Sequence, residues 1–241
     1  MDQEKSCGIE SAFEYEKKRL LAEAEYQALK AHFGDNTTTI LQTNYYFDTD
    51  DGMMAQKGIT CRIRQKSGMY QLTVKNHCID LDDCSHEVTL AKTATFDASL
   101  FYALGLQMQG ELITERTILY KDVFCEMVVD KNTYLGYTDY ELEIEYCQKH
   151  IGFVTLLLER VAKVLMPVNA SHNIEQMRPA HETTSKAQRF FERKLCSATG
   201  LSCVGVFSQH SSAFGNIHSD GGITDKVGYN PDEYLKKYFV L

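Results

Sequence analysis

Charged and apolar residues alternate along many short stretches of this chain, which is the pattern of strands with one polar and one apolar face. In FEYEKKRLL, residues 13–21, the charges Glu14, Glu16 and Lys18 fall on alternate positions. On a strand they share one face, and Phe13 and Tyr15 share the other. Similar stretches predict eight strands in all, at residues 13–21, 42–49, 59–65, 70–75, 85–90, 112–120, 123–131 and 138–146.

Other segments have the spacing of helices. Residues 20–33, 95–106 and 152–166 have helical patterns, and residues 50–58 form a short helical turn or a loop. In the third of these, the stripe expected to face the core holds Phe153, Leu156, Leu157, Val161, Val164 and Leu165, and Pro167 should end the helix. A last helix is expected over Ser185–Leu195, where Ser185 and Gln188 have capping-box spacing. Its inward positions are Ala187, Phe190, Phe191 and Leu195.

The charged strand faces allow two arrangements. An open antiparallel sheet could keep its charged face in water. However, these faces hold few Ser, Lys and Gln, and their charges are sorted: bases on the third, fourth and sixth strands, and acids on the first, fifth, seventh and eighth. A closed barrel with a charged interior would suit a charged ligand, because Arg binds phosphate oxygens and carboxylates bind magnesium or manganese. We therefore expect an interior that binds a polyanion together with a metal.

Composition narrows the function further. The chain has 241 residues, 44% of them hydrophobic, and a formal net charge of −8, which argues against a general nucleic-acid coat. Neither a membrane-spanning run nor a signal peptide is recognisable, so a cytoplasmic protein is expected. The eight cysteines form no CxxC pair and are interpreted as free thiols. HCIDLDDCSH, residues 77–86, matches no zinc-finger spacing and is interpreted as a loop.

An ordered set of motifs resembles the CYTH, or triphosphate tunnel metalloenzyme, superfamily, and in particular its small bacterial stand-alone members. The set comprises ExExK at Glu14, Glu16 and Lys18, the run TNYYFDTDDGMMAQKGITCRIRQKSGMYQLTVK, the run VVDKNTYLGYTDYELEIE and a late SK. The resemblance covers about residues 10–195. It implies an α+β fold, in which an eight-stranded antiparallel closed β-barrel forms a tunnel with a charged lumen and helices pack outside.

The resemblance also implies roles for the charged residues. The phosphate-binding residues would be Lys18, Arg62, Arg64, Lys75, Arg116 and Lys186. The ligands of magnesium or manganese would be Glu14, Glu16, Asp130, Glu143 and Glu145, with Glu87, Glu126 and Glu141 as further lumen acids. The residues closest to catalysis would be Glu14, Glu16, Lys18, Arg62 and Arg64. Tyr45, Tyr46 and Phe47 are interpreted as packing residues.

The expected activity is metal-dependent hydrolysis of the terminal phosphate of a triphosphate, with inorganic tripolyphosphate as the leading substrate. Thiamine or nucleoside triphosphate hydrolysis, a class IV-type adenylate cyclase and a non-hydrolysing polyphosphate-binding module stay open as alternatives. The partner is a small-molecule triphosphate, without nucleic acid or membrane, and a monomer and a homodimer both stay open. Residues 1–196 would form the catalytic domain, and residues 197–241 an extension without a recognisable motif that is dispensable for the chemistry.

Overall fold

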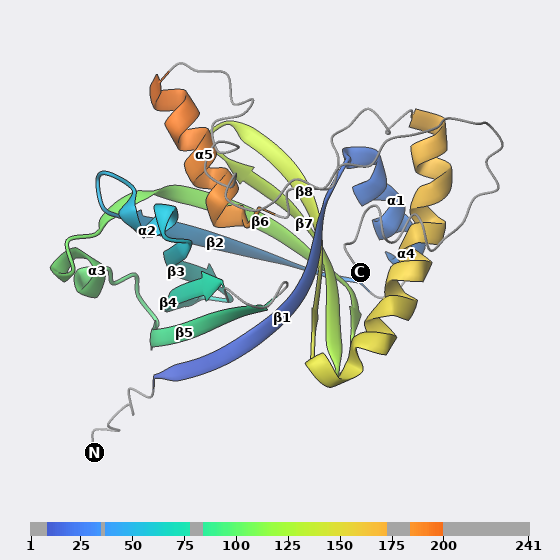
Figure 1. The fold of residues 1–241 in the computed structure, drawn as a ribbon, viewed down its shortest axis with the longest axis horizontal. Helices are drawn as coiled ribbons and strands as arrows, with labels where there is room; N and C mark the ends of the chain where they lie inside the picture. The colour runs from blue at the N-terminus through green and yellow to red at the C-terminus, as the bar shows by residue number, and fades with distance from the viewer. Residues whose placement is uncertain (1–8, 35–36, 78–83, 173–183, 200–241) are drawn as a thin grey trace, which may run out of the picture.

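Eight antiparallel strands form a closed barrel, and helices pack around it (Figure 1). The structure is a computed structural model and describes residues 9–34, 37–77, 84–172 and 184–199. Around the barrel the strand order is β1-β5-β4-β3-β2-β6-β7-β8, so that β1 pairs with both β5 and β8. The predicted fold is therefore confirmed, and the alternative of an open sheet with one face in bulk water is wrong.

Most strands extend beyond the limits expected from the sequence, whereas the helical segments expected at residues 20–33, 50–58 and 95–106 are shorter than expected. The strands are β1 (Glu10–Leu21), β2 (Thr38–Asp48), β3 (Ile59–Lys66), β4 (Met69–His77), β5 (Cys84–Thr93), β6 (Gln107–Lys121), β7 (Cys125–Tyr134) and β8 (Tyr137–Tyr146). The α-helices are α1 (Glu23–Phe33), α2 (Met53–Gln56), α3 (Ser99–Ala103), α4 (Ile151–His172) and α5 (Lys186–Thr199), with a 3₁₀ turn, η2, at Gln148–His150.

Two tight hairpins connect neighbouring strands. Ser67 and Gly68 join β3 to β4 with φ angles of 52° and 77°, and Leu135 and Gly136 join β7 to β8 with 48° and 78°. Left-handed conformations at both central positions match the twist of the flanking strands, and glycine adopts them at little cost. The hairpin expected at Gly68 is confirmed.

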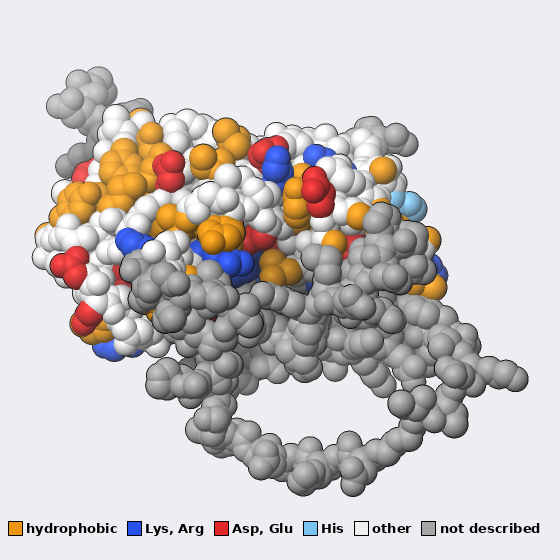
Figure 2. All heavy atoms as spheres, turned by 90° about the horizontal axis from the view of Figure 1, so that it is seen from above, with side chains coloured by type: hydrophobic (Ala, Val, Ile, Leu, Met, Phe, Trp, Pro, Cys, Tyr) orange, Lys and Arg blue, Asp and Glu red, His pale blue; other side chains and the backbone are white. Residues whose placement is uncertain are grey.

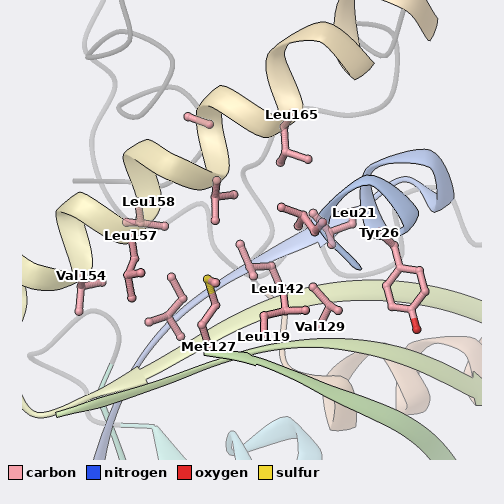
Figure 3. Close-up of a cluster of buried hydrophobic side chains, with 14 of the residues drawn as sticks. Leu21, Tyr26, Leu119, Met127, Val129, Leu142, Val154, Leu157, Leu158 and Leu165 are labelled. Carbon is pink, nitrogen blue, oxygen red and sulfur yellow. The ribbon is translucent and has the colours of Figure 1, made fainter. Parts of the chain in front are cut away.

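The largest apolar core lies outside the barrel, beneath α1 and α4 (Figure 3). Met127 and Val129 of β7 and Leu142 and Ile144 of β8 are all fully buried in it. They alternate along their strands with Asp130, Glu141 and Glu143, whose side chains therefore point to the opposite face, into the barrel. The predicted separation of apolar and charged faces is thus correct for these strands.

Helix α4 packs on this core with a stripe slightly different from the predicted one. Its fully buried side chains include Val154, Leu158 and Leu165, whereas Leu156 is 56% exposed, so the inward position assigned to Leu156 is wrong. The helix also continues past Pro167. Proline removes one helical hydrogen bond, here to the carbonyl of Lys163, which lies on the exposed side where water can satisfy it.

A second outer cluster lies beneath α3, where Phe47 of β2 packs on Phe101 with ring centroids 4.9 Å apart. At the end of β2, the buried Asp48 accepts hydrogen bonds from the backbone N–H groups of Met54 and Ala55, at 2.8 and 2.9 Å. This carboxylate therefore satisfies donors at the start of α2, where it has a structural role.

Helix α5 packs against the interior of the barrel rather than its outside. Its Ala187 and Phe190 form a buried cluster with Tyr46, Leu112 and Tyr134, which belong to the inward faces of β2, β6 and β7. In Figure 1, α5 lies at the opposite side of the barrel from α1 and α4. The helix thus fills the interior at one end with apolar side chains.

The structure modifies several predictions for α5. Ser185 Oγ accepts a hydrogen bond from the N–H of Gln188 at 3.2 Å, which is one half of the predicted capping box. Leu195 was expected to face inward but is 42% exposed, and Cys196 is buried instead. The helix ends at Thr199, beyond the predicted end at Leu195.

Some expectations fall outside the described residues. Residues 78–83, which belong to the loop expected at residues 77–86, lie outside the described ranges. Most of the expected extension, from residue 200 onward, lies outside them too. Five described cysteines, Cys61, Cys84, Cys125, Cys147 and Cys196, are free thiols as expected. In the described part of the chain, no helix is long and apolar enough to cross a membrane.

Candidate functional site

A narrow polar cavity lies inside the barrel, and most of the predicted site residues line it. Its charged lining residues are Glu14, Glu16, Lys18, Arg62, Arg64, Lys75, Arg116, Glu143, Glu145 and Lys186. They come from β1, β3, β4, β6, β8 and the first turn of α5. Lys and Arg side chains gather in a recess near the centre of one face of the molecule, close to acidic ones (Figure 2).

Strand register explains why the acids and bases separate. On the β1–β8 side, Glu16 lies opposite Glu145 and Lys18 opposite Glu143. On the β2–β3 side, Arg64 lies opposite Asn44 and Arg62 opposite Tyr46, so neutral side chains flank the guanidinium groups. One wall is therefore rich in carboxylates and the other in cations.

The wall formed by β6, β7 and β8 is held by a buried ionic network around Arg116. Its guanidinium donates two hydrogen bonds to Asp130, at 3.0 and 2.7 Å, and a further bond to Glu143. Lys186 of α5 joins the network, with its Nζ 2.9 Å from Asp130, 2.8 Å from Glu141 and 2.5 Å from Glu143. Burial would raise the pKa of Glu143, but attraction to Lys186 and Arg116 lowers it well below its ordinary value.

Four of the predicted acids do not line the cavity: Glu87, which pairs with Arg62, and the three acids Asp130, Glu141 and Glu126. Asp130 is fully buried behind Arg116, and Glu141 is held by Lys186 and by Arg189, whose Nη2 donates to it at 2.8 Å. Glu126 pairs instead with Lys121 at 2.6 Å, close to where β7 begins. Each of these three carboxylates is thus neutralised within the protein.

The other predicted bases differ in how well they are neutralised. Arg62 donates hydrogen bonds to Glu87 at 2.6 Å and to Thr73 at 3.1 Å. The predicted lumen acid Glu87 is therefore the carboxylate partner of Arg62. Lys75 donates to Glu14 at 2.8 Å and lies 3.5 Å from Glu16, and Lys18 lies 3.0 Å from Glu16. These cations each have a carboxylate partner.

Arg64 has no carboxylate within 4 Å among the described residues, and its Nε donates a hydrogen bond to the Oδ1 of Asn44, at 3.0 Å. Arg64 borders the cavity and is partly exposed, yet the surrounding walls desolvate it. This desolvation, with repulsion from Arg62, lowers its pKa to about 10. Burial and repulsion from Arg116 and Arg64 likewise lower the pKa of Lys66, two residues along β3. This stretch of β3 has an excess of positive charge that an anion would neutralise.

The opposite wall has an excess of negative charge at Glu145. Its side chain keeps 43% of its surface exposed to the cavity. Desolvation raises the pKa of Glu145 above its ordinary value. Attraction to Arg116 opposes this shift, and repulsion from Glu143, Glu16 and Glu14 adds to it. Among the described residues, no three His, Cys, Asp or Glu side chains already converge on a common metal position. The carboxylates therefore have the chemistry of a hard-cation site, but Glu14 and Glu16 are paired with lysines and Glu145 lies 3.7 Å from Arg116.

Sequence reasoning missed several residues of the cavity wall. Gln42, Tyr46, Thr60, His77 and Ser185 also line it. Tyr46 does pack as expected, with its ring centroid 5.0 Å from that of Phe190, but it borders the cavity as well. Gln42, Tyr46 and Thr60 could have been found from strand parity, since they share the inward faces of β2 and β3 with residues at even positions such as Arg62.

Comparisons with known proteins agree with this architecture. Residues 12–190 match the CYTH domain family. A Bacillus subtilis (strain 168) protein named "Putative triphosphatase YjbK" is 27% identical over an alignment of 205 residues, and the match covers 75% of this chain and 95% of that protein.

Solved structures share the fold at lower identity. A Bacillus halodurans protein described as a "putative adenylate cyclase" is 23% identical, with a TM-score of 0.52, covering 75% of this chain and 98% of that one. The protein HpAC1 from Hippeastrum, whose description reports a dominant triphosphatase activity, is 21% identical with a TM-score of 0.50, covering 75% and 96%.

Proposed function

The chain belongs to the CYTH domain family, and from that premise we propose that it hydrolyses the terminal phosphate of inorganic tripolyphosphate in a reaction that requires magnesium or manganese. The names of the relatives YjbK and HpAC1 refer to triphosphatase activity, which supports hydrolysis as the reaction type. The choice of substrate and of metal rests on the charges and rings of the cavity.

The observation that carries the proposal is the unneutralised guanidinium of Arg64. A desolvated cation without a carboxylate partner is costly unless an anion binds it. Phosphate oxygens would match the planar guanidinium group with two parallel hydrogen bonds. Arg62 and Lys75 stand on the same inward surface of the barrel, so a triphosphate in the cavity could contact several cations along its length.

The chain's own residues would then act in two ways. Arg62, Arg64, Lys18 and Lys75 would bind phosphate oxygens and hold the triphosphate in one orientation. Arg116 and Lys186, fixed by buried carboxylates, would form a rigid part of the wall that stabilises negative charge developing on the transferred phosphoryl group.

Glu14, Glu16 and Glu145 have the donor chemistry for a divalent metal ion, since magnesium and manganese prefer carboxylate oxygens. The raised pKa of Glu145 supports this choice, because the repulsion from neighbouring acids that contributes to the shift would be relieved by a cation. When bound, the ion would supply charge neutralisation and activation of the attacking water. Lys18 and Lys75 would have to release Glu16 and Glu14 for these carboxylates to turn toward the ion.

Inorganic tripolyphosphate is favoured because the described lining offers little to an organic group. Tyr46 and His77 carry the only rings among the residues that line the cavity. Tyr46 is already packed against Phe190 and Phe191, with centroids 5.0 and 5.9 Å away. A nucleobase or thiamine ring would therefore find no free aromatic face on Tyr46 to stack on.

A substrate comparison tests the proposal. Orthophosphate release by the purified full chain is measured with tripolyphosphate, ATP and thiamine triphosphate, each with magnesium, with manganese and with EDTA. We expect the highest kcat/KM for tripolyphosphate and no release in EDTA. A higher kcat/KM for ATP or thiamine triphosphate would contradict the substrate assignment, and formation of cyclic AMP would identify a cyclase.

The role of Arg64 is tested with a matched pair of variants. Arg64→Ala should lower kcat/KM for tripolyphosphate by about tenfold or more, because a hydrogen bond to a charged group contributes roughly 1.5–3 kcal/mol. Lys163→Ala removes an exposed positive charge from the outer helix α4 and should leave kcat/KM unchanged. Equal activities of the two variants would contradict the proposal that Arg64 binds substrate.

A further inference from the structure

Two buried tyrosines of the barrel interior differ in how their hydroxyl groups are satisfied. Both pack against Phe190 of α5, with centroids 5.0 Å from Tyr46 and 6.3 Å from Tyr134. The Tyr134 hydroxyl donates to Asp139 at 2.7 Å. The Tyr46 hydroxyl is buried and has no hydrogen-bond partner in the described part of the protein. Since a buried polar group without a partner destabilises a fold, the Tyr46 hydroxyl calls for a functional explanation.

The surroundings of Tyr46 indicate which kind of ligand could form a hydrogen bond with its hydroxyl group. Tyr46 lines the cavity and lies opposite Arg62 in the β2–β3 register. The cations Arg62, Lys186 and Arg64 all act on its phenol electrostatically, and desolvation outweighs them and raises its pKa, so the hydroxyl stays protonated at neutral pH. A protonated hydroxyl among cations can donate to a bound anion.

Asn44, the next inward residue on β2, has a related arrangement. Its Oδ1 accepts the hydrogen bond from Arg64, and its Nδ2 is buried without a partner among the described residues. Asn44 therefore orients Arg64 and has a donor to spare. Gln42, one position further along, has an unpartnered Oε1 instead. That atom is an acceptor and does not complement a phosphate oxygen.

We propose that the Tyr46 hydroxyl donates a hydrogen bond to a phosphate oxygen of the bound triphosphate, and that Asn44 positions Arg64 for the same group. This inference rests on the proposed function and adds a neutral donor to the cationic wall. Tyr46 would be a substrate-binding residue and Asn44 a positioning residue. The tyrosine ring also packs on α5, so the same side chain would contribute to substrate binding and to the position of α5.

The test compares Tyr46→Phe with Tyr134→Phe, each of which removes one hydroxyl from a tyrosine beside Phe190. Three quantities are measured on the full chain: the dissociation constant of tripolyphosphate in EDTA by calorimetry, its KM in magnesium, and the Tm without ligand. Tyr46→Phe should weaken tripolyphosphate binding by about tenfold, because one hydrogen bond to a phosphate oxygen is lost. Its Tm should equal or exceed that of wild type, because the hydroxyl that is removed has no partner in the ligand-free protein. Tyr134→Phe should lower Tm and leave binding unchanged.

Each result bears on the proposal. Unchanged tripolyphosphate binding by Tyr46→Phe would overturn the inference while leaving the proposed function intact. A lower Tm for Tyr46→Phe in the absence of ligand would also overturn it, since the hydroxyl would then have a partner within the protein. If wild type neither binds nor hydrolyses tripolyphosphate, the proposed function fails, and this inference fails with it. For Asn44, Asn44→Leu should weaken binding to a similar extent as Arg64→Ala, and unchanged binding would overturn its positioning role.

Discussion

The Nζ atom of Lys186 lies 2.9 Å from the Oδ2 of Asp130, so the first residue of α5 is tied to the inner wall of the barrel. Asp130 is fully buried and also accepts two hydrogen bonds from Arg116. With both carboxylate oxygens engaged by cations, Asp130 has little capacity left for a metal ion. We therefore expect it to fix Arg116 and α5, although the family resemblance suggested a metal ligand.

Asp130→Asn should destabilise the protein without changing its metal requirement. Removing one partner of a buried ionic network typically costs about 3–5 kcal/mol, because the remaining charges stay buried. We expect a loss of that order in the free energy of unfolding, measured by urea denaturation, and an unchanged magnesium midpoint of activity. The control is Asp50→Asn, an exposed carboxylate in the turn after β2. A shifted magnesium midpoint with unchanged stability would instead identify Asp130 as a metal ligand.

Glu145→Gln should stabilise the metal-free protein at neutral pH. The pKa of Glu145 in the folded protein is raised above its ordinary value of 4.5. Because the folded state holds this proton more tightly than the unfolded state, the ionised group destabilises the fold as pH rises through and above this window. The gain in Tm should therefore be present at pH 7 and shrink toward pH 4. Thermal unfolding in EDTA across this range measures it, and a gain that grows on acidification would contradict the assignment.

Glu16→Gln and Arg64→Ala should respond differently to metal. The glutamine keeps the shape of Glu16 but removes a negative ligand, so higher magnesium or manganese should restore part of the activity by mass action. Loss of a phosphate-binding guanidinium should raise KM at every metal concentration. Metal titrations at several tripolyphosphate concentrations separate the two effects. Rescue of Arg64→Ala by metal, or a wild-type titration for Glu16→Gln, would reverse these roles.

Gly110→Ala should displace α5. Gly110 has a φ of +143°, and an added Cβ would lie 2.8 Å from Cζ of Phe190. Because α5 carries Lys186, we expect both a lower Tm and a lower kcat/KM for tripolyphosphate. Gly152→Ala, where a Cβ would meet nothing within 4 Å, is the control. Adding Phe190→Leu to Gly110→Ala should recover part of the loss, and no difference between the single and double variants would argue against this contact.

The alternation of residue types was sufficient to predict the strands and their faces. Met127 and Val129 are buried in the outer core and the intervening charged faces are turned inward, because strand side chains alternate with a strict period of two. Closure of the barrel could not follow from that period alone. It depends on β1 pairing with both β5 and β8, which are distant in sequence, and the ordered motifs were needed to predict it.

Ion-pair partners were beyond the reach of the sequence. Parity places Lys18 and Glu143 on inward faces, but long side chains can choose among several neighbours once the strands have closed. The contact of Lys186 with Asp130 additionally requires α5 to enter the barrel, which its amphipathic pattern does not reveal. The exposure of Leu156 had a simpler cause, since a helical stripe displaced by one residue turns by about 100°.

The central claim is hydrolysis of the terminal phosphate of tripolyphosphate, and its products can be followed directly. The full chain is mixed with tripolyphosphate in a buffer that contains magnesium and no manganese. Phosphorus NMR of this reaction would resolve substrate, pyrophosphate and orthophosphate in one experiment. We predict that tripolyphosphate disappears while pyrophosphate and orthophosphate form in equal amounts, and that EDTA stops the reaction. A parallel reaction with manganese is analysed after the metal has been removed. If the protein is folded and the tripolyphosphate signals stay unchanged with both metals, the account is contradicted.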